Sequence, residues 1–211
     1  MKFWYYTVLI CAASFSRPLL AASYELELVA QDGSPVPGAV LYLEPLDDTA
    51  LNIVAPGVMD QVDRQFLPHI LVVQRGAEVD FPNSDSIKHH VFSFSKAKTF
   101  EIQLYKGATA TPVVFDQDGE IELGCNVHDW MLGYIYVVNT PFFARSDAKG
   151  IALIDAPPGR YQLGVWHPQI QEDFESLKRE IRSADLRHQV VLVQPLLPRY
   201  EPESADEFSD Y

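Results

Sequence analysis

Short runs of alternating or continuous apolar residues, separated by turn residues, make up most of the chain from residue 24 to residue 193. Residues 24–30 alternate between apolar and polar side chains, and Asp32-Gly33 and Pro37-Gly38 then turn the chain. Comparable apolar runs lie at 39–43, 70–73, 78–81, 90–94, 100–104, 111–115, 120–123, 132–138, 151–154, 161–166 and 189–193. Many short strands at this spacing predict an all-β protein of the sandwich type.

Residues 171–182 have a different pattern. Phe174, Leu177 and Ile181 fall on one face at helical spacing, and charged residues occupy the other positions. We therefore predict one helix over residues 171–182 in an otherwise β chain.

Residues 1–23 have the features of an export signal. Lys2 is the only charge before an apolar run at 3–15, and Ala21-Ala22-Ser23 offers small residues for cleavage. The run is too short to cross a bilayer, and no later segment approaches the ~20 apolar residues that a membrane helix needs. We expect a periplasmic protein that is exported through a cleaved signal peptide and does not insert into the membrane.

The chain is strongly acidic, with a formal net charge of −13 at pH 7. Loss of Lys2 and Arg17 with the signal would make the exported chain more negative still. Such a charge argues against nucleic acid and anionic membranes as partners. Residues 197–211 are rich in acidic side chains, and we expect them to form a disordered acidic tail.

Once the signal and its Cys11 are removed, the chain keeps a single cysteine, Cys125. A single cysteine cannot form a disulfide within its own chain, and a lone thiol is oxidised in an oxidising compartment unless it is buried or bound to metal. Cys125, His128 and Met131 follow one another at three-residue intervals. A buried apolar cysteine beside a methionine that fills a gap in the core is the simpler interpretation, but the histidine between them favours a metal site.

Two adjacent histidines, His89 and His90, lie upstream in a predicted strand. Adjacent strand residues point to opposite faces, so only one of the two can join Cys125 at a common site. One thiolate, two imidazoles and a weak thioether form the ligand set of a blue-copper electron-transfer site. The residues predict a single copper bound by Cys125, His128, Met131 and one histidine of the pair.

Other chemistry fits this set less well. A thioether is a poor ligand for zinc, and covalent haem attachment would need a Cys-x-x-Cys-His motif that the sequence lacks. A cysteine hydrolase could use Cys125 with a histidine, but its free thiolate would be prone to oxidation. We expect no enzymatic activity and assign no metal role to His69, His167 or His188.

The middle of the chain resembles the cupredoxins of the plastocyanin and amicyanin group. The likeness lies in Phe66-Leu67-Pro68, Phe81-Pro82-Asn83, His89-His90-Val91 and the short Cys-x-x-His-x-x-Met loop within residues 115–139. It implies a Greek-key β-sandwich over residues 57–139, with His89, Cys125 and His128 as equatorial copper ligands and Met131 as the axial one. His90 stands where the family commonly has asparagine, and Val127 where proline is usual.

Two further resemblances concern the whole chain and its flanks. The Leu-Gly-Cys-Asn-x-His-Asp-Trp-Met segment is similar to that of bacterial proteins labelled methylamine utilization proteins. Residues 24–48 and 140–196 carry turn signatures similar to those of carboxypeptidase-regulatory-like or transthyretin-like β-sandwiches. This resemblance implies a second, discontinuous sandwich into which the cupredoxin domain at 57–139 is inserted. The alternative is one extended cupredoxin whose outer strands are additional.

The resemblance implies one-electron transfer through the copper, with His128 passing the electron and Trp130 and Leu132 in the docking patch around it. We expect a monomer whose partner is a redox protein, such as a basic cytochrome attracted by Asp129 and the acidic surface. Two alternatives remain open: a copper carrier or storage protein without redox turnover, and an interaction module whose copper is structural.

Overall fold

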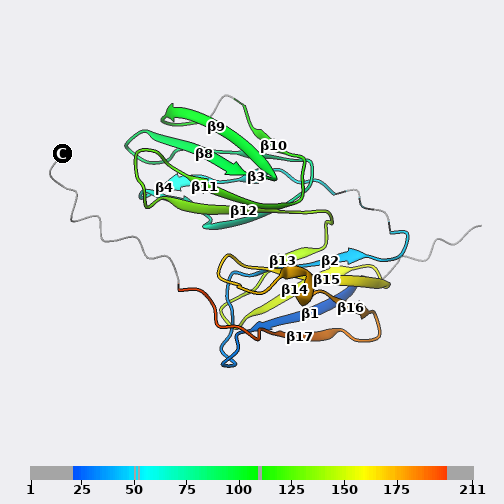
Figure 1. The fold of residues 1–211 in the computed structure, drawn as a ribbon. Helices are drawn as coiled ribbons and strands as arrows, with labels where there is room; N and C mark the ends of the chain where they lie inside the picture. The colour runs from blue at the N-terminus through cyan, green and yellow to red at the C-terminus, as the bar shows by residue number, and fades with distance from the viewer. Residues whose placement is uncertain (1–20, 50, 52, 109–110, 199–211) are drawn as a thin grey trace, which may run out of the picture.

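The structure is a computed structural model that describes residues 21–49, 51, 53–108 and 111–198. These residues form strands and one short helix, which confirms the predicted all-β fold class (Figure 1). The strands are β1 (Ala22–Val29), β2 (Val40–Pro45), β3 (Gly57–Val58), β4 (Asp60–Val62), β5 (Gln65–Leu67), β6 (Ile70–Gln74), β7 (Ala77–Asp80), β8 (His89–Ser95), β9 (Lys98–Tyr105), β10 (Val113–Phe115), β11 (Gly119–Gly124), β12 (Leu132–Val138), β13 (Phe143–Arg145), β14 (Ile151–Ala156), β15 (Arg160–Trp166), β16 (Arg179–Arg182) and β17 (Arg187–Val191).

The two ends of the described chain build one part of the molecule, here called the terminal part. It consists of the sheet β14-β1-β17 and the sheet β13-β2-β15-β16, drawn in the lower half of Figure 1. Alternate residues of β1, namely Tyr24, Leu26 and Leu28, are fully buried and pack with Leu41 and Leu163 from the other sheet. The alternation that predicted the first strand thus supplies one side of this core.

The middle of the chain builds a second pair of sheets, here called the central part. A five-stranded sheet, β6-β12-β11-β8-β9, faces a three-stranded sheet, β10-β7-β3. Phe81 and Phe115 from the smaller sheet and its flanks pack with Ile121, Leu123 and Ile135 from the larger one, and all five are fully buried. β6 pairs with β12 in parallel, whereas β11 pairs with β12 as an antiparallel hairpin. The short β4–β5 hairpin adds to this part.

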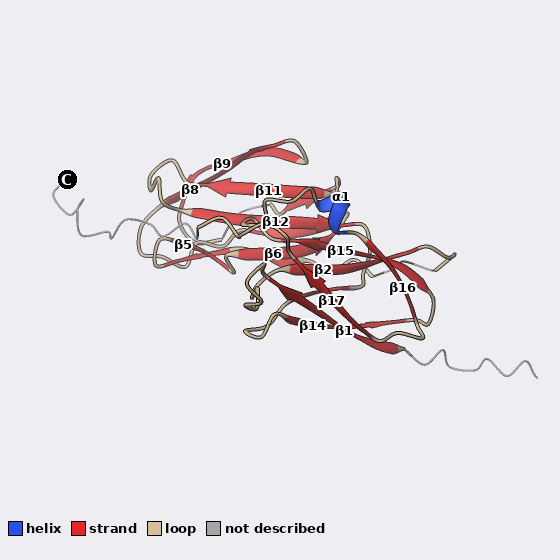
Figure 2. Ribbon diagram, turned by 60° about the horizontal axis from the view of Figure 1, so that its bottom comes forward, coloured by secondary structure: helices blue, strands red, loops and turns tan. Residues whose placement is uncertain are grey.

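A third apolar cluster joins the two parts, here called the junction cluster. Figure 2 shows β6 and β12 of the central part beside β2 and β15 of the terminal part. Its largest side chain, Trp166, is fully buried, stacks on Tyr136 with ring centroids 4.6 Å apart, and donates its indole N–H to Glu120 at 3.1 Å. The cluster consists of Val40, Tyr42, Ile70, Tyr134, Val138 and Trp166.

The helix predicted over residues 171–182 is wrong for most of its length. Helix α1 covers only Phe174–Leu177, and the chain is extended again at Lys178. Residues 179–182 form β16, which pairs with β15 from Leu163↔Arg179 to Arg160↔Arg182. The open edge of β15 offers backbone hydrogen-bond partners to an extended chain. Leu177 and Ile181 are buried in the terminal core from these two different elements, so tertiary pairing overrides the local helical spacing.

The predicted export signal and the predicted acidic tail lie mostly outside the described residues. Residues 1–20 of the predicted signal and residues 199–211 of the predicted tail lie outside the described residues. The first described fully buried side chain is Tyr24, directly after the predicted cleavage segment. Leu197, the first residue of the predicted tail, donates its amide to the carbonyl of Gln169. The domain limits stay predictions. Within the described residues, no helix is long and apolar enough to span a membrane.

Candidate metal centre

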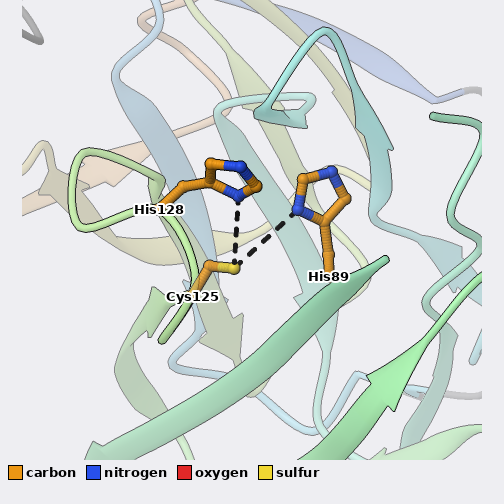
Figure 3. A group of neighbouring side chains, drawn as sticks. All are labelled: His89, Cys125 and His128. Atoms are coloured by element: carbon orange, nitrogen blue, oxygen red, sulfur yellow. Dashed lines mark hydrogen bonds between the residues drawn. The ribbon is translucent and has the colours of Figure 1, made fainter. Parts of the chain in front are cut away.

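Three of the predicted ligands meet at one end of the central part. His89 begins β8, Cys125 directly follows β11, and His128 lies in the loop between β11 and β12. The Sγ atom of Cys125 lies 3.8 Å from Nδ1 of His89 and 3.9 Å from Nδ1 of His128. Figure 3 shows both imidazole rings directed at the sulfur. One donor atom from each residue lies within 4.8 Å of the others.

The loop that carries Cys125 is held at both ends by aromatic rings. A Cβ atom at Gly124 would lie 2.6 Å from the ring of Phe92, and one at Gly133 would lie 2.7 Å from Cβ of Phe66. A larger residue at Gly124, the last residue of β11, would displace the ring of Phe92, and one at Gly133, near the start of β12, would displace Phe66. Within the loop, the amide of Met131 donates to the carbonyl of His128 at 2.9 Å, which closes a tight turn and brings His128 back toward Cys125.

The ring of His89 is fixed from its far side by Asp85. Nε2 of His89 lies 2.6 Å from the Oδ2 atom of Asp85, and the imidazole is fully buried. An ionised carboxylate accepts hydrogen bonds only, so Nε2 carries the proton. In the neutral ring Nδ1 then has an unprotonated lone pair, and this lone pair faces the sulfur of Cys125. A carboxylate in this position orients a metal-binding histidine.

Asp85 is itself held by the turn between β4 and β5. Asp63 and Arg64 both have left-handed backbone conformations, with φ of 51° and 57°. Their amides donate to the Asp85 carboxylate at 2.7 and 2.9 Å. Burial opposes ionisation, but the hydrogen bonds from Arg64, His89 and Asp63 together lower the pKa of Asp85. The carboxylate therefore stays ionised and keeps His89 in its ligand tautomer.

His128 is the most accessible member of the group. Its ring is half-buried, whereas Cys125 and His89 are buried. Its centroid lies 4.9 Å from that of His89 and 5.2 Å from that of Trp130. Burial, followed by the neighbouring His89, lowers the pKa of His128. A lowered pKa favours the neutral ring, which is the form that binds metal.

His90 points elsewhere. Its Nε2 atom pairs with the carboxylate of Glu101 on β9 at 2.8 Å, and its ring lies against Phe92. The β8–β9 register shifts at this point, because His89 pairs with Tyr105 while Val91 pairs with Ile102. This irregularity leaves His90 opposite two residues of β9, as in a β-bulge. The structure therefore groups His89, and not His90, with the cysteine.

Met131 is buried in the core of the central part. It is 2 % exposed and belongs to the same apolar cluster as Cys125. Its thioether contributes to that core. The structure brings Cys125, His89 and His128 together by direct contacts and places Met131 in the same apolar cluster as Cys125.

The donor set fits a metal ion. A metal bonded at about 2.3 Å to sulfur and about 2.0 Å to nitrogen holds these two atoms about 3.5–3.8 Å apart, close to the spacing of Cys125 and the two histidines. Among the described residues, the group contains no carboxylate. The nearest one described above, that of Asp85, binds Nε2 on the far side of the His89 ring. Two imidazoles and one thiolate with a buried thioether nearby suit copper better than zinc or magnesium.

Asp85 is the functional residue that the sequence pattern did not identify. Asn83-Ser84-Asp85 has the composition of a turn, and the amide of Asp85 does donate to the side chain of Asn83 at 3.0 Å. An acidic residue four positions before a candidate ligand is a usable signal for an orienting carboxylate. Its contact with His89 depends on a turn in a different hairpin, which residue spacing does not reveal.

Among known proteins, this chain is similar in structure to copper proteins that share little sequence identity with it. No protein-family model matches the sequence, and no curated protein matches it. Among solved structures, the chain is similar to the copper-containing nitrite reductase (NirK) of Thermus scotoductus SA-01, with 22% identity and a TM-score of 0.37. The match covers 45% of this chain and 25% of the nitrite reductase, so the chain spans a quarter of that protein's length.

Two smaller proteins are similar over nearly their whole length. A purple cupredoxin from Nitrosopumilus maritimus shares 20% identity, with 39% of this chain and 99% of that protein covered and a TM-score of 0.35. The reduced Cu(I) form of an amicyanin variant at pH 4 shares 19% identity, with 46% and 98% covered and a TM-score of 0.36. The likeness to methylamine utilization proteins stays a prediction.

Proposed function

We propose that this protein is a cupredoxin that binds one copper ion and transfers single electrons between redox partners. The observation that carries the proposal is the position of the Cys125 sulfur between the Nδ1 atoms of His89 and His128. When bound, copper would supply the one-electron exchange between Cu(II) and Cu(I). His89, Cys125 and His128 would hold it, with Met131 as the weak fourth ligand.

The protein's own contribution would be a rigid and dry site. Asp85 keeps the His89 lone pair directed inward, and the apolar cluster beneath Cys125 excludes water from the buried side. A site whose ligands do not move between oxidation states exchanges electrons with little reorganisation. His128 is the accessible ligand, so the electron would pass through its outer edge.

The partner would be a redox protein with a basic surface, and the protein itself would be a monomeric carrier and not an enzyme. The chain has a formal net charge of −13, and Asp129 is exposed next to His128. Opposite charges accelerate such encounters, which are typically small and short-lived. The sequence of residues 1–23 supports export and a periplasmic location.

The test is a Cu(II) titration of the purified protein followed by visible and EPR spectroscopy, with Cys125→Ser in parallel. We expect an intense thiolate-to-copper charge-transfer band and narrow hyperfine splitting that are both lost in the variant. A spectrum that is unchanged by the substitution, or the absence of any such band, would overturn the copper-thiolate site.

Electron transfer is tested separately from copper binding. The copper form should be reduced and reoxidised repeatedly by small redox reagents and should keep its metal in the presence of a chelator in both states. A protein that shows the band but gives up its copper at each cycle would instead be a copper carrier or storage protein. A redox-inert copper form would leave a β-sandwich interaction module.

A further inference from the structure

A cavity of about 660 Å³ lies where the central and terminal parts meet. Its lining comes from segments far apart in the chain: the loop before β2, the turn between β5 and β6, the start of β12, β13, the turn after β15 and residues 196–198. None of the proposed copper ligands belongs to this lining. The volume is within the range of small-molecule sites, roughly 300–1,000 Å³.

The charge of the lining is opposite to that of the protein. The chain has 29 acidic side chains and a net charge of −13, yet among the described residues none that lines this cavity is acidic. The ionisable side chains in the lining are Arg145, His69, His167 and Tyr134. A lining whose described residues combine a cation with two imidazoles and contain no carboxylate favours an anionic ligand.

Arg145 provides the fixed positive charge. It is exposed on β13 and spans to the central part, where its guanidinium donates one hydrogen bond to the carbonyl of Ile70 at 2.5 Å. Within the described chain it has no ion pair with a carboxylate. A guanidinium has five N–H donors in a fork that matches a carboxylate. The contact with Ile70 therefore holds Arg145 in place and leaves donors for a ligand.

His167 adds a neutral donor. It is buried, and its Nδ1 atom accepts the amide N–H of Gln169 at 3.3 Å. Burial, followed by the nearby His69, lowers the pKa of His167 to about 4. The ring is thus neutral at pH 7, and because Nδ1 accepts, the proton is on Nε2.

The rest of the lining is mostly apolar. Leucine and proline side chains contribute most of it, among them Leu67, Pro68, Leu132, Leu196 and Leu197. Leu67 is 56 % exposed and Leu197 is 44 % exposed, so apolar surface remains open to solvent. A ligand that covers these side chains would need an apolar body in addition to its charge.

We propose that this cavity binds a small organic monocarboxylate with an apolar body, whose carboxylate pairs with Arg145. The apolar body lies against the leucine and proline side chains of the lining. The lining contains Leu132 but none of the proposed metal ligands, so we expect binding that does not need the copper.

The experiment is isothermal titration calorimetry of the purified protein with 3-phenylpropanoate, its neutral amide 3-phenylpropanamide, and acetate. We expect the phenylpropanoate to bind at least tenfold more tightly than either of the others. The amide tests the charge, and acetate tests the apolar body. Equal binding of acid and amide, equal binding of acetate, or no measurable binding of phenylpropanoate would each overturn the proposal.

Two variants locate the binding. Arg145→Gln should weaken phenylpropanoate at least tenfold and leave the amide unchanged, whereas Leu197→Trp, at an exposed position, should fill the cavity and weaken both. Arg182→Gln is the matched control, because it removes the same charge from an exposed ion pair with Glu180 on β16. An equal loss in the Arg182 variant would mean that net charge, and not this cavity, determines the affinity.

The same titrations on Cys125→Ser separate this site from the copper site. Unchanged phenylpropanoate binding in that variant is expected whether or not the copper proposal holds. Loss of binding in Cys125→Ser, with the variant still folded by circular dichroism, would overturn the independence of the two sites.

Discussion

The five-stranded sheet of the central part contributes to two regions that are held together in different ways, the junction cluster and the candidate metal centre. At the junction, rings from both parts pack in contact, and Trp166 meets Tyr136 and the carboxylate of Glu120. At the metal end, His89 and His128 face one sulfur at distances that suit a bound ion. The junction gains its stability from close packing, whereas at the metal end the ring of His89 is held by the Asp85 carboxylate behind it.

The β11–β12 hairpin contributes residues to both the junction and the metal centre. Glu120, near the start of β11, accepts the Trp166 indole at the junction, and Cys125 follows the end of the same strand. These two contacts lie at opposite ends of one strand. We therefore expect damage at the junction to be measurable without loss of the metal site.

Removal of the largest ring at the junction should have the largest effect. Trp166→Ala deletes a fully buried indole, and such substitutions cost about 3–5 kcal/mol of unfolding free energy. Urea unfolding measures this loss, and the copper spectrum of the folded variant should stay unchanged. A changed copper spectrum in a variant that is still folded by circular dichroism would contradict the separation of the two regions.

The second-largest effect should be a loss of unfolding free energy at low pH, caused by His167 beside the junction. His167 has a pKa of about 4 in the folded protein against 6.5 in the unfolded chain. Between these values the unfolded state binds more protons, so stability is lost as the pH falls. The wild type should lose about 3 kcal/mol more than His167→Gln between pH 7 and pH 4. Parallel pH profiles of unfolding for the two proteins would contradict this prediction.

The metal end is best tested by removal of the support behind His89. Asp85→Asn keeps the shape of the side chain and removes its charge, and loss of such a partner typically costs about 10–100-fold in metal affinity. Competition against a chelator measures the affinity, and the reduction potential gives a second measurement that misfolding would not shift in a defined direction. Asp63→Asn is the control, because only its backbone amide contacts Asp85.

The smallest effect should come from the neighbour of the ligand. His90→Asn removes a hydrogen bond to the exposed Glu101 and should cost about 1 kcal/mol of stability with no change in the copper spectrum. His89→Asn, the matched substitution one residue earlier, should abolish the charge-transfer band. If His90→Asn has the larger effect on the band, the assignment of His89 is wrong.

The strands were predictable where their signal is local. Alternation at residues 24–30 identifies β1, because one face of that strand is buried and the other is not. The spacing of Cys125, His128 and Met131 is also local, since one short loop carries all three. The helix prediction over residues 171–182 was wrong for most of its length because its signal is local but the outcome is not. Their apolar spacing is helical, yet residues 179–182 pair with the edge of β15 as a strand.

The contacts that support the metal centre, and those that form the cavity, join residues from separate segments of the chain. Asp85 becomes important only because the amides of Asp63 and Arg64 and the ring of His89 all reach it from other segments. The cavity needs Arg145 from β13 and His167 from the turn after β15 to meet residues of the central part. Asp85 does lie four residues before His89, but the contacts that hold Asp85 and form the cavity are determined by the packing of the sheets.

The parallel pairing of β1 with β17 determines how the protein would respond to mechanical force. The two strands lie side by side in register from Glu25↔Arg187 to Val29↔Val191, and the chain enters at the start of one and leaves at the end of the other (Figure 1). A pull on both ends therefore shears the whole ladder at once instead of unzipping it bond by bond. The central part is inserted between β2 and β13, beyond this clamp. Tension on the termini would reach the proposed copper site only after the clamp had broken.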